Sequence, residues 1–249
     1  MRRGTQGSPS IYRLGLFLPK PEFIQYWRYF QRALKQRNKS LKQRLSTDQI
    51  QLWDQALISS SEVIHAMRSN YVQQLMPVVQ SYCQQLMPEL ESQLEFSLRS
   101  GWPKNQPDLA ELMHQNLMKD RQLGHTQYGA HRADLRFKFD QVEARQMLSR
   151  GQQKLFVCAL LLAQASLQQQ LHNEPVIMLI DDLPAELDAQ HRLTLMKLLD
   201  QLGIQHFITT TSDKLIDVID VDQCAAWTIQ NGSIVPNPIH ALHKTETPQ

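Results

Sequence analysis

The sequence lacks the patterns that would place it in a membrane or in an oxidising compartment. Its longest uninterrupted apolar run, residues 155–163, is about half of the roughly 20 residues that a bilayer-spanning helix requires. The start of the chain, MRRGTQGSPS, has no apolar stretch after its arginines. Three cysteines, Cys83, Cys158 and Cys224, are far apart and form no CxxC pair, which argues against a zinc site. We expect no membrane span and a reduced, cytoplasmic setting.

Neither sign of charge dominates the chain. It has 26 Lys and Arg against 24 Asp and Glu, a formal net charge of +2. Overall charge therefore argues neither for nor against a polyanionic partner, and any signal for nucleic acid must be local. With 249 residues, of which 42% are hydrophobic, the chain can bury one large core or two modest ones.

Glycine is absent from residue 21 to residue 98, and in this part apolar residues recur at spacings of three and four. Such spacing is typical of amphipathic helices. Pro77 and Pro88 mark kinks or breaks in the second helical stretch, residues 52–98. We expect an antiparallel helical arm lobe over residues 13–122, preceded by an unrelated leader at residues 1–12.

Residues 123–249 show the patterns of an α/β domain. Apolar and charged residues alternate between residues 134 and 142, which predicts a half-buried strand. The apolar segments 176–180 and 206–211 are typical of buried strands in a parallel sheet that helices cover on both faces. Near the end, Asn231-Gly232 separates two further strand-like segments and predicts a tight hairpin.

The segment LSRGQQ, residues 148–153, precedes a helix that is apolar on nearly every side. Ser149 and Gln152 have the spacing of a capping box, which would gather the hydroxyl of Ser149 and the free amides of Arg150, Gly151 and Gln152 at the positive end of the helix dipole. An anion is stabilised in such a place, and a glycine lets a phosphate approach the backbone. Most boxes of this kind only start a helix, so the neighbouring motifs must decide.

A pair of acids, Asp181-Asp182, directly follows the apolar segment 176–180. The carboxyl ends of strands in open α/β sheets are where ligands bind, and paired carboxylates there can hold the water shell of Mg²⁺ and face an attacking water. Taken alone, the pair is more often the start of a loop. Glu186 and Asp188 then lie in the segment AELD at the entry to a helix.

A row of five cations lies within the first helical stretch. Spacings of four, three, four and three residues place them on one face of a helix, and no acid occurs between Glu22 and Asp48. A phosphate backbone could lie along this row, or the row could be a solvated face whose side-chain stems cover apolar surface. The five residues, called here the cationic row, are Arg28, Arg32, Lys35, Lys39 and Lys42.

Together these segments resemble the RecF proteins, which are relatives of the ABC ATPases. LSRGQQK resembles the ABC signature motif in its RecF form, VIMLIDD resembles a Walker B strand, and AELD is similar to a D-loop. YGAHRADL, at residues 128–135, resembles the GPHRADL-like segment of RecF proteins, and RALKQRN, at residues 32–38, resembles a motif on their helical arm. The order of the segments, from about residue 14 to residue 219, matches the family.

The resemblance implies an α/β ABC-type, P-loop NTPase-like ATPase head with a helical arm, in which two copies hold ATP between them. Ser149, Arg150, Gly151 and Gln152 would then contact ATP bound to the partner copy. Asp181 would serve Mg²⁺, Asp182 would polarise water, and Glu186 and Asp188 would lie at the dimer seam. RecF proteins bind DNA gaps as ATP-dependent dimers and, with RecO and RecR, help to load RecA.

Two departures limit what this chain can do alone. It contains no GxxxxGK[ST], so the loop that cradles the β- and γ-phosphates is missing and the predicted head is incomplete. Asp182 stands where ordinary ABC ATPases have Glu, which predicts slow hydrolysis. We therefore expect either an ATP-gated DNA repair protein whose phosphate loop comes from elsewhere, or a truncated, non-catalytic interaction module. A nuclease using Asp181 and Asp182 is the least favoured alternative, because no further acids or histidines form a catalytic pattern.

Overall fold

The structure is a computed structural model, and it describes residues 21–90, 92–103, 108–172, 175–182, 187–212 and 224–237. The chain divides into two compact units. Unit 1 runs to Pro77 and resumes from Ser92 to Met147, whereas unit 2 comprises Val78–Glu91 and everything from Leu148 onward. The expected boundary near residue 122 does not coincide with this division, because residues 123–147 belong with the helices of unit 1.

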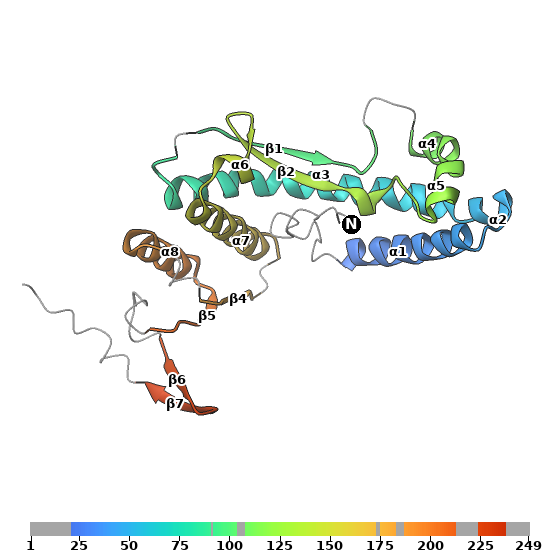
Figure 1. Cartoon of the computed structure of the whole chain (residues 1–249). Helices are drawn as coiled ribbons and strands as arrows, with labels where there is room; N and C mark the ends of the chain where they lie inside the picture. The colour runs from blue at the N-terminus through green and yellow to red at the C-terminus, as the bar shows by residue number, and fades with distance from the viewer. Residues whose placement is uncertain are drawn as a thin grey trace, which may run out of the picture. The chain divides into compact units, whose positions relative to one another are not determined.

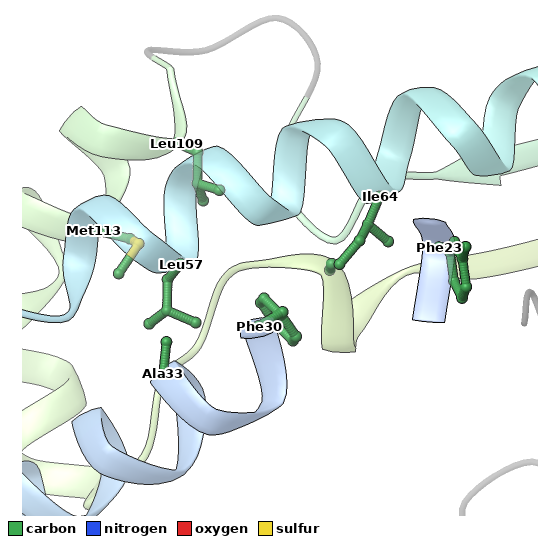
Figure 2. Close-up of a cluster of buried hydrophobic side chains, with 8 residues drawn as sticks. Phe23, Phe30, Ala33, Leu57, Ile64, Leu109 and Met113 are labelled. Carbon is green, nitrogen blue, oxygen red and sulfur yellow. The ribbon is translucent and has the colours of Figure 1, made fainter. Parts of the chain in front are cut away.

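Helices form most of unit 1, and Figure 1 shows α1 beside the first part of α3. Phe23, Phe30 and Ala33 of α1 pack against Leu57 and Ile64 of α3 in a fully buried cluster (Figure 2). Leu109 and Met113 close the cluster from α4. The helices are α1 (Pro21–Lys42), α2 (Thr47–Gln51), α3 (Asp54–Leu86), which continues into unit 2, α4 (Leu109–Gln115) and α5 (Leu117–Leu123).

An antiparallel sheet completes unit 1. Its strands are β1 (Leu94–Arg99), β2 (Asp134–Phe139) and β3 (Val142–Glu143), in that order across the sheet. The strand expected from residue 134 is confirmed, but the helical interpretation of residues 52–98 is wrong at its end. Helix α3 contains Pro77 and stops at Leu86, and residues from 94 onward form β1 instead. Cross-strand pairs such as Phe96 opposite Phe137 stabilise this arrangement.

Unit 2 combines helices with short strands. Strands β4 (Ile177–Ile180) and β5 (Gln205–Ile208) pair in parallel, as their apolar sequences predict, and α8 (Ala189–Leu202) connects them. The other long helix is α7 (Arg150–His172), whose Phe156, Ala159 and Ala163 are fully buried. A parallel pair joined by a helix is the repeating unit of doubly wound folds.

The predicted hairpin is confirmed as β6 (Ala226–Gln230) and β7 (Ser233–Asn237). Asn231 and Gly232 have φ angles of 51° and 79°, and a two-residue turn of this kind matches the right-handed twist of the flanking strands. Short elements complete the described chain: the 3₁₀ turn η2 (Ala130–Arg132) and helix α6 (Ala144–Met147).

The sheet surfaces of unit 2 differ from the expectation of buried central strands. Leu179 of β4 is 76% exposed and Ile229 of β6 is 77% exposed. Further exposed apolar side chains on these strands are Ile177, Phe207, Trp227, Ile234 and Val235. Apolar parallel strands are normally covered on both faces, whereas the apolar side chains of β4 and β5 named here are exposed.

Among the described residues, none of the helices combines the length and the hydropathy that a bilayer crossing requires.

Candidate nucleotide site and helical arm

The segment LSRGQQ forms the start of α7 with the geometry that its sequence predicts. The backbone N–H of Gln152 donates to Ser149 Oγ at 3.2 Å, and the backbone N–H of Ser149 donates to Gln152 Oε1 at 3.0 Å. This reciprocal pair is a complete capping box. Leu148, the residue before this capping box, is buried. Its carbonyl accepts a hydrogen bond from the side-chain amide of Gln153 at 2.9 Å, and this bond fixes the entry of the chain into the helix.

The same loop is open to an incoming group. Ser149, Arg150 and Gly151 are exposed, and a Cβ added to Gly151 would meet no other atom within 4 Å. Within this first turn the amide of Gln152 is bonded to Ser149 Oγ, and Arg150 and Gly151 lie exposed at the positive end of the dipole of a 23-residue helix. A helix start of this kind can stabilise an anion.

The two acids after β4 are fixed by the end of the neighbouring strand. Thr209 Oγ1 donates to Asp181 Oδ1, and the backbone N–H of Asp182 donates to Thr209 Oγ1 at 3.0 Å. The backbone N–H of Thr209 donates to the carbonyl of Ile180 at 2.9 Å. Thr209 was missed as a site residue, although parallel strands place their carboxyl ends at one edge, which is the signal that could have found it.

The two carboxylates lie beyond the end of the strand. β4 ends at Ile180, and Asp182 has φ of +48°, a left-handed conformation that Asp tolerates better than most residues. Both carboxylates are exposed. Their relative direction is therefore set by a turn and by Thr209, and not by the pleat of a strand.

Asp188 is the N-cap of α8. Its carboxylate accepts from the backbone N–H of His191 at 3.0 Å and contacts His191 Nδ1 at 2.6 Å, and these bonds lower the pKa of Asp188. Its carbonyl accepts from the backbone N–H of Arg192. Glu186, the other acid of this segment, lies outside the described residues.

The cationic row lies on one exposed face of α1, as its spacing predicts. All five side chains are exposed, and none forms an ion pair with another residue that the structure describes. Tyr26 and Tyr29, which are 42% and 53% exposed, lie on the same helix.

A sixth cation on this helix, Arg37, is fully buried and was not singled out from the sequence. Its Nε donates to Asp54 at 2.6 Å, and its Nη1 donates to Asp120 at 2.6 Å and to Thr126 at 2.9 Å. Asn38 accepts from the backbone N–H of Thr126 at 2.8 Å. The motif RALKQRN therefore has a structural role, because its last two residues hold α1 against α3, α5 and the loop after α5.

The motif YGAHRADL is held in a similar way by α3. Ser61 accepts from the backbone N–H of Ala130 at 3.2 Å, and Arg68 Nη1 donates to the carbonyl of Ala130 at 2.8 Å. Arg68 also lies over the rings of Phe23 and Trp27, at 5.7 and 5.1 Å, and burial lowers its pKa to about 10. Within the described ranges, no three His, Cys, Asp or Glu side chains gather as a metal site would require.

The chain is similar to proteins of one known family. Residues 31–234 match the model of the RecF/RecN/SMC N terminal domain. The chain belongs to this family. Within it, the chain groups with the RecF proteins. A protein of Hydrogenovibrio crunogenus, named DNA replication and repair protein RecF, is 53% identical over 235 residues. These residues are 94% of this chain and 65% of that protein. A protein of the same name from Pseudomonas aeruginosa is 41% identical over 219 residues, which are 86% of this chain and 58% of that protein.

Solved RecF structures share the fold. One, described as the recombination mediator protein RecF-ATPrS in the RecFOR pathway, matches with a TM-score of 0.72 at 23% identity, covering 87% of this chain and 59% of the other. Another, described as RecF-ATP in the same pathway, has a TM-score of 0.71. The expected fold, an α/β ABC-type ATPase head with a helical arm, is confirmed. The chain spans about three fifths of the length of the relatives it matches.

Proposed function

We propose that this chain forms the signature and Walker B part of a RecF-type DNA replication and repair protein that dimerises on ATP. The observation that carries the proposal is the preformed loop at the start of α7, where the Ser149 hydroxyl and the open backbone at Gly151 are available to a phosphate. The proposal is supported by the relatives, which are named DNA replication and repair protein RecF.

Each site residue has a proposed task. Ser149, Arg150, Gly151 and Gln152 bind the γ-phosphate of ATP held by a partner copy, since the helix dipole and free amides stabilise an anion there. Asp181 positions Mg²⁺ through its water shell, and Asp182 orients the attacking water. Asp188, with Glu186, lies at the dimer seam. ATP and Mg²⁺ supply the phosphoryl-transfer chemistry when the phosphate loop that this sequence lacks is present.

The cationic row is the proposed DNA-contacting surface of the arm. Arg28 and Lys39 are eleven residues apart, which is about 16 Å along a helix, and duplex DNA carries one phosphate charge per roughly 1.7 Å of its axis. DNA gaps, RecO and RecR are the proposed partners, with RecA loading as the outcome and the cytoplasm as the location. Whether the assembled protein is a weak ATPase depends on the missing loop.

The test is to supply the amino-terminal part of the Hydrogenovibrio crunogenus relative together with this chain and to measure ATP-dependent dimerisation by sedimentation. Ser149→Arg should abolish the dimer while leaving nucleotide binding nearly intact, because a guanidinium would fill the space of the partner's γ-phosphate. Gln170→Arg, at the exposed far end of α7, is the matched control and should leave the dimer unchanged. A dimer that persists in the Ser149 variant removes the signature assignment.

A second candidate is a non-catalytic interaction module. It is favoured by the exposed apolar faces of β4, β5 and the β6–β7 hairpin, and by the missing GxxxxGK[ST]. In this case adding the amino-terminal part would restore neither ATP binding nor dimerisation. The same sedimentation experiment therefore separates the two functions.

A further inference from the structure

The described part of unit 1 contains a cavity that no step of the proposed function uses. Its volume is about 460 Å³, within the range of a few hundred to a thousand Å³ typical of small-molecule sites. It lies where the end of β1 meets the turn η2. The residues that line it are Arg99, Ser100, Gly101, Trp102, Pro103 and Arg132.

Two glycines bring the walls of this cavity together. Gly101 has φ of +102°, and a Cβ placed on it would lie 2.2 Å from the carbonyl oxygen of Gly129 and 2.9 Å from the backbone nitrogen of Ala133. The backbone N–H of Gly129 donates to the carbonyl of Gly101 at 3.3 Å. Because only a residue without a side chain permits this approach, the segment bearing Arg99 lies directly beside the segment bearing Arg132.

The cavity carries two positive charges that no acid among the described residues pairs with. Arg99 and Arg132 are exposed, and neither forms an ion pair with another described residue. Asp134 lies opposite Arg99 on the neighbouring strand, but its carboxylate pairs with Nε of Arg136 at 3.3 Å. Nη1 of Arg136 is also 3.7 Å from the carboxylate of Glu143. Two guanidinium groups are thus left for a ligand, and paired arginines bind phosphate through several donors at once.

An aromatic wall accompanies the two cations. Trp102 is partly buried, with its indole ring 5.5 Å from His65 in an edge-to-face arrangement, so its position is set by the core of unit 1. Ser100 Oγ donates to the carbonyl of Trp102 at 2.6 Å and fixes the turn between them. A rigid indole beside two arginines can stack a planar base while the cations hold its phosphate.

We infer that this cavity binds a nucleotide unit, with the phosphate held by Arg99 and Arg132 and the base placed against Trp102. A phosphate alone would fill only part of 460 Å³, whereas a nucleotide suits both the volume and the lining. The unit is either a free nucleotide or one residue of a single strand of DNA. The inference goes beyond the proposed function, because the cavity needs neither the signature loop, the carboxylates of unit 2 nor the cationic row.

The test uses the full chain without ATP and without any added part, so its outcome does not depend on dimerisation. Binding of a short, fluorescently labelled single-stranded oligonucleotide is measured by anisotropy over a series of salt concentrations. Unlabelled dAMP and inorganic phosphate serve as competitors. Arg99→Gln/Arg132→Gln removes the two cavity charges, and Arg44→Gln/Lys119→Gln removes two exposed charges elsewhere in unit 1 as the matched control.

We expect the cavity variant to bind the oligonucleotide at least about tenfold more weakly than the control variant, because each charge-assisted hydrogen bond contributes about that factor. The slope of log affinity against log salt should fall by about 0.7, because the variant no longer neutralises the one single-strand phosphate that the two arginines hold. Competition by dAMP identifies a site for free nucleotide, and binding of the oligonucleotide without competition by dAMP identifies a site for a strand.

Two results would overturn the inference. If the cavity variant and the control variant bind equally, the arginines of the cavity hold no phosphate. If inorganic phosphate displaces the oligonucleotide and does so as strongly as dAMP, the indole contributes nothing and the site is not one for a nucleotide. Circular dichroism of both variants checks that unit 1 remains folded, which is expected because all four side chains are exposed.

Discussion

Replacing Arg37 by Met should strongly destabilise unit 1. Arg37 is 0% exposed and shares its guanidinium between Asp54 and Asp120, both at 2.6 Å. Met keeps the length and apolar character of the side-chain stem but removes the charge. Asp120, itself 1% exposed, would then keep a buried carboxylate without its cation.

The expected loss is about 3–5 kcal/mol in the free energy of unfolding, the usual cost of removing one partner from a buried ion pair. A typical domain has only about 5–15 kcal/mol in total, so the variant should be close to unfolding at 37 °C. Adding Asp120→Asn should recover about 1–3 kcal/mol, since it removes the orphaned charge. The new amide oxygen can still accept the backbone N–H of Gln127, which lies 3.1 Å from Asp120 Oδ1.

The loss of unfolding free energy in the Arg37→Met variant should depend on pH in a defined direction. Burial raises the pKa of Asp54 and of Asp120, and Arg37 opposes this by lowering both. Without Arg37 both pKa values rise further above the unfolded value of about 3.9. An acid whose folded pKa is raised binds more protons when folded, so stability falls as pH rises from the unfolded pKa through the folded one. The variant should therefore lose most stability at neutral pH and regain it as the pH is lowered through the raised pKa values of the two acids.

Urea denaturation followed by tryptophan fluorescence measures this effect in unit 1. Three of the four tryptophans, Trp27, Trp53 and Trp102, lie in unit 1, and a Trp227→Phe background removes the one in unit 2. Arg32→Met, an exposed change on the same helix, is the control and should alter stability by less than about 0.5 kcal/mol. A loss below about 1 kcal/mol for Arg37→Met, or one independent of pH, would refute the reasoning.

Three further predictions concern other parts of the chain. Gly101→Ala should lower the urea midpoint of unit 1 by several times the effect of Gly124→Ala, because a Cβ at residue 101 meets backbone at 2.2 Å, whereas at Gly124, also in unit 1 and at positive φ, it meets only Lys42 Cγ at 3.4 Å; equal effects would contradict the close approach. Ser149→Ala should cost about 1 kcal/mol through loss of the cap and should speed hydrogen exchange at the amides that follow it. Leu179→Gln together with Ile229→Gln should reduce binding of an apolar fluorescent dye without changing circular dichroism, and unchanged dye binding would mean that these side chains are covered in solution.

The sequence predicted those features whose determinants lie within a few residues of one another. Ser149 and Gln152 are three apart, and Asn231-Gly232 needs only its two flanking strands, so local geometry decided both. Strand β1 shows where this fails. Leu94 and Leu98 fit both a helical spacing from Leu86 and an alternation with Phe96, and nothing within the segment chooses between them. The choice is made by β2, which lies about 40 residues further along the chain.

The buried network of Arg37 lay beyond prediction for the same reason. Its partners are 17, 83 and 89 residues away, so spacing within α1 shows only another cation among several. One local sign was present: Arg37 falls outside the cationic row, on the apolar face of the helix with Phe30 and Ala33. A lone cation on an apolar stripe is costly to bury without acids, so its position already implied partners from elsewhere in the fold.

The candidate nucleotide site divides according to what stabilises each part. The loop at Ser149 is held by its own helix and by Leu148, and therefore keeps its geometry without contributions from any other strand. Asp181 and Asp182 depend on Thr209, and hence on the pairing of β4 with β5, whose apolar surfaces are exposed. A partner that covers these strands would thus rigidify the carboxylates and leave the loop unchanged. Hydrogen exchange should separate the two: covering the strands should slow exchange at Asp182 and Thr209 and have little effect at Gln152.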